Sequence, residues 1–190
     1  MAQFEVTWAG FGGQGVMVAG QLLAYAGINE GKNVVWLPSY GPEMRGGTAY
    51  CTVVISETRI GSPIINNPLC CCVFNRPSFD KFMPRVRPGG FLLVNSSLID
   101  VTTERDDITE VLVPANEMAL KAGNVRAANI AMFGAFVGAT GVIKHDSARD
   151  TIIQKLAKKK EVLEVNKTVF EKAFELGKKA VASRKKVAQR

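Results

Sequence analysis

The sequence predicts an α/β fold: a three-layer α/β/α sandwich with a mostly parallel sheet, one antiparallel element and a Rossmann-like start. Near the N-terminus a strand pattern, a glycine-rich turn and a helix pattern follow one another, and strand-like and helix-like runs alternate along the rest of the chain. The 190 residues, 47% of them hydrophobic, suit one domain that spans residues 1–190.

The first strand is indicated by Phe4, Val6 and Trp8, which alternate with polar residues. The first helix is indicated by apolar residues at helical spacing from Val16 to Ala26. The six residues Gly10-Phe11-Gly12-Gly13-Gln14-Gly15 lie between them. This context predicts a sharp turn from a strand into a helix.

Such a turn has the properties of an anion site. Gly10 and Gly12 can take positive φ and admit a ligand to the main chain, while Gly15 lets the helix pack closely on the strand. The helix opening near Gln14 presents unpaired N–H groups and the positive end of its dipole, where phosphate commonly binds. The candidate residues are Gly10, Gly12, Gly13, Gln14 and Gly15.

The glycine spacing also matches the dinucleotide fingerprint, which requires an acidic residue at the end of the second strand. Here the second strand, residues 33–37, runs into Pro38 and Ser39 without a carboxylate. An NAD- or FAD-binding oxidoreductase domain and a packing turn without a ligand both remain as alternatives.

A loop with two prolines and three glycines spans residues 38–47 and leads into a strong strand pattern at residues 48–56. Residues 57–61 predict that this strand turns back as a hairpin, which gives the antiparallel element. Arg45 in the loop can pair with a phosphate or carboxylate, or else with Glu43.

The later elements follow from the same patterns. Pro77 to Pro84 and a turn at 87–90 are predicted to connect two buried strands. The remaining expected elements are strands at 69–74, 91–95 and 111–114, and helices at 116–122, 129–141, 146–158 and about 166–185.

The net charge of +7 is concentrated in the C-terminal segment. Residues 155–190 hold twelve Lys or Arg and four Glu, a balance of +8, which leaves the body at −1. A solvated helix face accounts for this charge, so we expect no nucleic-acid partner, with an RNA-binding module as the competing interpretation. With no membrane-length apolar run and no secretory signal, the expected location is cytoplasmic.

Cysteine and histidine usage predicts no metal site and no catalytic residue in this chain. Cys51 and the run Cys70 to Cys72 lack zinc or iron–sulfur spacing and suit small apolar core residues. The single histidine, His145, precedes a helix and is interpreted as a surface or capping residue.

Three segments together resemble the gamma subunit of the ferredoxin-dependent 2-oxoacid oxidoreductases. They are Gly10 to Gly15, the loop Ser39-Tyr40-Gly41-Pro42-Glu43-Met44-Arg45-Gly46-Gly47, and NKTVFEKAFELG at residues 166–177. Their order and spacing match over nearly the whole chain.

The resemblance implies a complex that converts a 2-oxoacid, CoA and oxidised ferredoxin into acyl-CoA, carbon dioxide and reduced ferredoxin. Thiamine diphosphate, Mg and 4Fe-4S clusters would be held by alpha, beta and delta partner subunits, so this chain would be inactive alone. It also implies that Gly10, Gly12, Gly13, Gln14, Gly15 and Arg45 face the CoA phosphates, and that Ser39, Tyr40, Gly41, Glu43, Gly46 and Gly47 lie at the active site or a subunit interface. Pyruvate, 2-oxoglutarate, branched-chain and aryl oxoacids all remain open.

Overall fold

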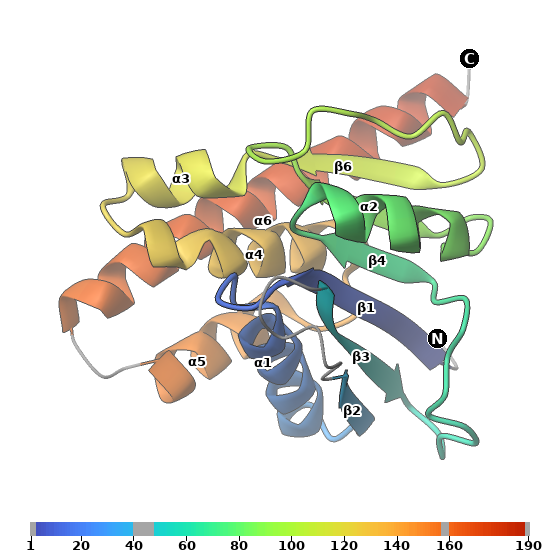
Figure 1. Ribbon diagram of the computed structural model, residues 1–190. Coiled ribbons are helices and arrows are strands. Elements are labelled where there is room, and N and C mark those ends of the chain that lie inside the picture. Colours follow the sequence, from blue (N-terminus) through green and yellow to red (C-terminus); the bar gives the residue numbers. More distant parts are fainter. Residues whose placement is uncertain (1–2, 40–47, 157–159, 189–190) are drawn as a thin grey trace.

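A six-stranded sheet forms the centre of the molecule (Figure 1). The computed structural model describes residues 3–39, 48–156 and 160–188. The strand order is β2-β3-β1-β4-β5-β6. The strands are β1 (Gln3–Phe11), β2 (Asn33–Ser39), β3 (Thr48–Ser56), β4 (Cys70–Val73), β5 (Phe91–Asn95) and β6 (Thr109–Val113).

The antiparallel element is β3 itself. It pairs antiparallel with both β1 and β2, whereas β1, β4, β5 and β6 pair in parallel. The mostly parallel sheet is therefore confirmed, but the expected hairpin after Ser56 is wrong, because residues 57–69 form no strand. The antiparallel hairpin is formed by β2 and β3 instead. In the sheet, β3 lies between β2 and β1, the two strands that α1 connects along the chain.

Helices cover the two faces of the sheet unequally. In Figure 1, α2 lies in front of the sheet, while α1, α4, α5 and α6 lie on the other side. The helices are α1 (Val16–Asn29), α2 (Arg76–Phe82), α3 (Ala115–Lys121), α4 (Ala128–Thr140), α5 (His145–Leu156) and α6 (Lys160–Ala188), with 3₁₀ turns η1 (Met83–Arg85) and η2 (Val125–Ala127). No helix in the described parts of the chain has the length and apolar character needed to cross a membrane.

Helix α2 lies in the connection through Pro77 to Pro84, for which the sequence predicted no particular element. The side chain of Asn75 accepts a hydrogen bond from the Ser78 N–H at 2.9 Å and caps the helix. Pro77 lies in the first turn, where an N–H group has no acceptor within the helix, so the lack of an N–H on proline costs no hydrogen bond. Pro77 is thus compatible with the start of this helix, and Pro84 lies beyond its end, in η1.

The larger core lies between the sheet and α1, α4 and α6. Trp8 of β1 is fully buried, and its ring centroid lies 5.1 Å from that of Phe136 and 6.4 Å from that of Phe133, both on α4. Phe133 in turn lies 6.0 Å from Phe170 of α6. Burying each of these aromatic side chains contributes about 1.5–3 kcal/mol.

Helices α4 and α6 approach each other closely. A Cβ placed on Gly134 would lie 2.6 Å from the Phe170 carbonyl oxygen and 3.2 Å from the Ala173 Cβ. Gly138 and Gly177 likewise face the main chain of the opposite helix. Only glycine permits this spacing, which fixes where α6 crosses the domain.

Candidate functional site

The glycine turn lies at the carboxyl end of β1 and leads directly into α1. Positive φ occurs at Gly13 (93°) and Gly15 (79°), and Gly15 is the N-cap of α1. Positive φ does not occur at Gly12, nor at Gly10, which lies within β1. Gly10 serves close packing instead: a Cβ there would lie 2.9 Å from both the Phe74 Cβ and the Val16 Cγ1.

The side chain of Gln14 ties the turn to the sheet. Its Oε1 accepts hydrogen bonds from the Phe11 N–H at 2.7 Å and from the Asn75 amide at 3.1 Å. Its Nε2 donates to the Phe74 carbonyl at 3.4 Å. The Gln14 amide therefore holds the turn in place from within, since its oxygen and its nitrogen both bond to neighbouring groups of the protein.

A hollow of 420 Å³ opens beside the turn. It is lined by Phe11, Gly12, Gly13, Gly15, the first turn of α1 and Ala49. The N–H groups of residues 16–18 have no acceptor within α1, because the first helical hydrogen bond runs from the Ala19 N–H to the Gly15 carbonyl. These donors and the helix dipole favour an anion in this place.

The strands that flank the second motif, the loop at residues 39–47, meet at the edge of the sheet where the glycine turn lies. In the β1–β3 ladder Phe11 pairs with Thr48, and in the β2–β3 ladder Ser39 pairs with Tyr50. The glycine turn and the two ends of the motif loop are thus brought together. Tyr40, Gly41, Glu43, Arg45, Gly46 and Gly47 lie outside the described residues, so their predicted roles stay predictions.

A row of buried carboxamides along this edge was missed by the sequence reasoning. Asn75 lies two residues after the end of β4 and bonds to Gln14, while Asn95 ends β5 and donates to the Asn116 Oδ1 at 2.8 Å. Asn129 at the start of α4 donates to the Gly15 carbonyl at 3.4 Å. For Asn75 and Asn95 the available signal was an asparagine at or just beyond the carboxyl end of a buried apolar strand.

The strand order also bears on the NAD or FAD alternative. In the dinucleotide fold the second strand lies beside the first, so that its terminal carboxylate reaches the ribose. Here β3 separates β2 from β1, and β2 ends in Pro38 and Ser39. Neither the position nor the residue type suits ribose binding.

The four cysteines are buried in the sheet. Burial raises the pKa of the Cys51 thiol to about 12 and raises the pKa values of Cys71 and Cys72 well above the ordinary range. Within residues 3–39, 48–156 and 160–188, no cluster of His, Cys, Asp and Glu is arranged to hold a metal ion. The cysteines act as core residues.

Taken together, the fold and the site define an α/β domain of the Rossmann-like class with an anion-favouring turn and, in its described parts, no cluster arranged to hold a metal ion. The model of the pyruvate ferredoxin/flavodoxin oxidoreductase family matches residues 5–176, and the chain belongs to this family.

Relatives with this module are named as oxidoreductase subunits. Ketoisovalerate oxidoreductase subunit VorA of Methanothermobacter marburgensis is 40% identical over 93% of this chain, which spans only 37% of that relative's length. The 2-oxoglutarate synthase subunit KorC of Methanocaldococcus jannaschii is 32% identical, with 92% of this chain and 94% of the relative covered.

A solved structure has the same fold over the full module. The keto/oxoacid ferredoxin oxidoreductase gamma subunit from Geobacter sulfurreducens is 28% identical, with a TM-score of 0.77, and the match covers 95% of this chain and 99% of that one. The module thus exists both as a separate subunit and as part of a longer chain.

Proposed function

We propose that this chain is the gamma subunit of a thiamine-diphosphate-dependent 2-oxoacid:ferredoxin oxidoreductase. The complex converts a 2-oxoacid, CoA and oxidised ferredoxin into acyl-CoA, carbon dioxide and reduced ferredoxin. Alpha, beta and delta partners hold the thiamine diphosphate, Mg and 4Fe-4S clusters. Membership of the family, together with relatives of matching length named KorC and gamma subunit, supports this assignment.

The gamma subunit helps to bind CoA and to close the active site. The observation that carries this proposal is the glycine turn, where free N–H groups at the start of α1 face a hollow beside the ends of the second motif. CoA brings a diphosphate and a 3′-phosphate, which are suited to such donors and to a guanidinium. We place Arg45 on these phosphates.

Affinity purification from the source cell tests the assignment. The expected result is recovery of brown, cluster-bearing partner subunits whose complex oxidises a 2-oxoacid in a CoA-dependent reaction, while the isolated chain is inactive. A stable monomer that never recovers such partners contradicts the proposal.

The variant Arg45→Ala in the assembled complex tests the role of the loop. Losing a charge-assisted phosphate contact should raise the apparent KM for CoA by roughly tenfold, with kcat little changed. Arg59→Ala is the matched control, since Arg59 is exposed on the segment after β3. An unchanged KM with a weakened complex, measured by size-exclusion chromatography, would show that Arg45 contacts a partner subunit instead.

A further inference from the structure

A second cavity lies on the face of the sheet that α2 covers. It measures 240 Å³ and is bordered by β1, β2 and β3, by residues 63–68, by the end of α2 and by η1. This face is the front of the sheet in Figure 1, whereas the hollow at the glycine turn is bordered by α1, which packs on the other face. The two spaces are therefore separate.

The floor of the cavity carries two hydroxyl groups. Thr7 of β1 pairs with Thr52 of β3, which in turn pairs with Leu37 of β2, so these side chains form one row across the sheet. On the other face of β1 and β3, the neighbouring residues Trp8 and Cys51 are apolar and fully buried. The polar floor is thus a property of the face that the cavity adjoins.

Thr7 and Thr52 retain a hydrogen-bond donor that their own contact does not use. Thr7 is 3% exposed and Thr52 is 8% exposed, and their hydroxyl oxygens lie 3.3 Å apart. Each residue brings one O–H group, and a hydrogen bond between the two oxygens uses only one of these hydrogens. Both residues line the cavity, so an acceptor placed there can pair with the other hydrogen.

Two cations lie around an aromatic pair at the border of the cavity. Tyr50 and Phe82 both line it, with ring centroids 5.2 Å apart. The Lys81 Nζ lies 5.3 Å from the Tyr50 centroid, and the Arg85 Cζ lies 5.5 Å from the Phe82 centroid. In the described parts of the chain, neither cation forms an ion pair with a carboxylate. Two positive charges are therefore available to an anion.

An acidic side chain on the same face of β1 does not offset these charges. Glu5 is 5% exposed, accepts a hydrogen bond from the Gln3 Nε2 at 2.9 Å and forms an ion pair with Arg87. Arg87 thus matches the charge of this carboxylate, and the charges of Lys81 and Arg85 remain unmatched.

The other walls of the cavity are largely apolar. They include Leu37, which is 38% exposed, and Ile64, which is 76% exposed. A hydrocarbon chain that covers such side chains removes apolar surface from water. The volume of 240 Å³ is below the range of about 300–1,000 Å³ that is usual for larger ligands, so the cavity suits a small molecule.

We propose that this cavity binds a short aliphatic carboxylate. Its oxygens pair with the Arg85 guanidinium and with the free O–H group of the Thr7–Thr52 pair, and its chain packs against Leu37 and Ile64. The planar guanidinium pairs with both oxygens of a carboxylate, which gives the site its chemical selectivity. The site is independent of the proposed role at the glycine turn.

An NMR titration of the full chain with butanoate at constant ionic strength tests the proposal. Butanoate should bind saturably at one site. Butanamide has a similar shape without the charge, and acetate lacks the chain, so both should bind roughly tenfold more weakly. Inorganic phosphate that shifts the same signals as strongly as butanoate would show an adventitious anion site only and would overturn the proposal.

The variant Arg85→Gln tests the placement of the carboxylate. Removing the charge-assisted contact should weaken butanoate binding roughly tenfold. Arg85 is exposed, so the melting temperature of the unliganded variant should change little. Arg59→Gln is the matched control, because Arg59 is exposed and does not line the cavity. Equal affinity in the wild type and Arg85→Gln overturns the proposal.

The variant Thr52→Val tests the hydroxyl pair, since valine keeps the shape of the side chain and lacks the O–H group. Butanoate binding should weaken roughly threefold to tenfold. Thr109→Val on β6 makes the same replacement away from the cavity and should leave binding unchanged. If Thr52→Val folds poorly, Arg85→Gln still decides the outcome. A chain that binds no butanoate overturns this site and leaves the gamma-subunit assignment, which the recovery of partner subunits tests, intact.

Discussion

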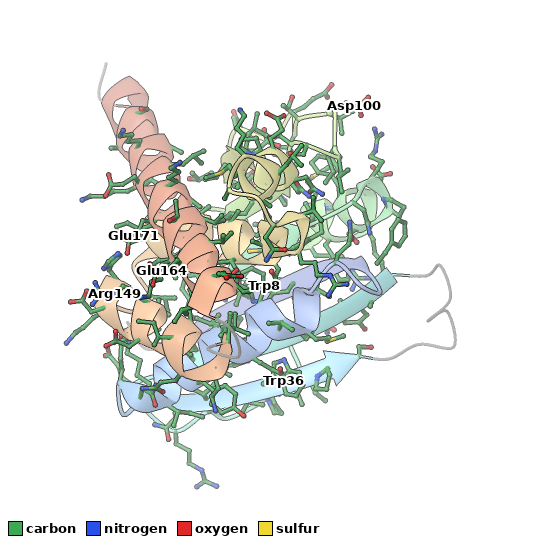
Figure 2. All side chains as sticks on the ribbon, turned by 90° about the vertical axis from the view of Figure 1, so that its left-hand side faces the viewer. Trp8, Trp36, Asp100, Arg149, Glu164 and Glu171 are labelled. Atoms are coloured by element: carbon green, nitrogen blue, oxygen red, sulfur yellow. The ribbon has the colours of Figure 1, made fainter. Side chains whose placement is uncertain are left out.

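At the residue scale, His145 links two helices through its imidazole ring. Its Nδ1 lies 3.0 Å from the Asp146 Oδ1 and its Nε2 lies 2.8 Å from the Glu171 Oε2 on α6. The ring also packs on Phe174, with centroids 4.7 Å apart. Figure 2 shows Glu171 along α6. The residue expected to be a surface or capping histidine thus joins α5 to α6.

This link predicts a pH-dependent stability. Partial burial lowers the pKa of His145, but the hydrogen bonds and charges of Glu171 and Asp146 outweigh it, so the pKa is raised. A raised folded-state pKa adds stability that is fully present below about pH 6.5 and is lost as the pH rises through the folded-state value. His145→Gln should therefore cost up to about 1 kcal/mol more at low pH than at high pH.

Urea unfolding of the wild type and of His145→Gln, each at about pH 5.5 and pH 8.5, measures this difference in the free energy of unfolding. Arg149, which lies 3.7 Å from Asp146, keeps its charge across this range and does not produce the difference. A cost of His145→Gln that is the same at both pH values would contradict the protonated link.

At the element scale, the α4–α6 contact depends on glycine. The variant Gly134→Ala would place its Cβ 2.6 Å from the Phe170 carbonyl, and a main-chain neighbour cannot move aside cheaply. Alanine gains about 1 kcal/mol of helix propensity, but the clash should exceed this and leave a net loss of about 1–3 kcal/mol.

The free energy of unfolding in urea measures this loss. Gly61→Ala is the control, because a Cβ at Gly61 meets nothing within 4 Å and its change should stay within about 0.5 kcal/mol. A neutral or stabilising Gly134→Ala would mean that the two helices can separate without cost.

The elements themselves were largely predictable, and their pairing was not. The spacing of apolar residues along the sequence located all six strands and most helices, since this spacing shows which side of an element is buried. The spacing carries no information about neighbours, so the position of β3 between β1 and β2 could not be derived. Helix α2 was not predicted, although Asn75 at the N-cap and Pro77 in the first turn are both signals of a helix start.

The candidate site was likewise predictable only in part. The glycine turn was predictable because local geometry requires glycine, although positive φ falls at Gly13 and Gly15 instead of Gly10 and Gly12. Gln14 and Asn75 are 61 positions apart in sequence order, and their side-chain hydrogen bond depends on β4 lying beside β1. A convergence of this kind depends on tertiary structure and leaves no local pattern.

At the scale of the whole molecule, four thiols lie in the central sheet, one on β3 and three on β4. Cys51, Cys70, Cys71 and Cys72 are each 0% exposed, and the pKa of Cys51 is raised to about 12 by burial. Reaction with a thiol reagent at about pH 8 should therefore require unfolding of the sheet. The native chain should react slowly, and all four thiols should react quickly in urea.

The labelling rate at increasing urea concentrations checks this expectation. Its dependence on urea should match that of global unfolding followed by tryptophan fluorescence, since Trp8 lies in the same core. Rapid labelling of the native protein would show that β3 or β4 opens independently.

The position of β3 also affects how the chain is made. β1 and β2 are joined by α1 but are not neighbours, so neither can complete its hydrogen bonds with the other. During synthesis β1 has no partner until Ser56 has left the ribosome and the β2–β3 hairpin can dock beside it. Until residue 56 has emerged, β1 is therefore an unpaired apolar strand and α1 has no complete sheet to pack on. At this stage of synthesis the nascent chain would most need protection from aggregation.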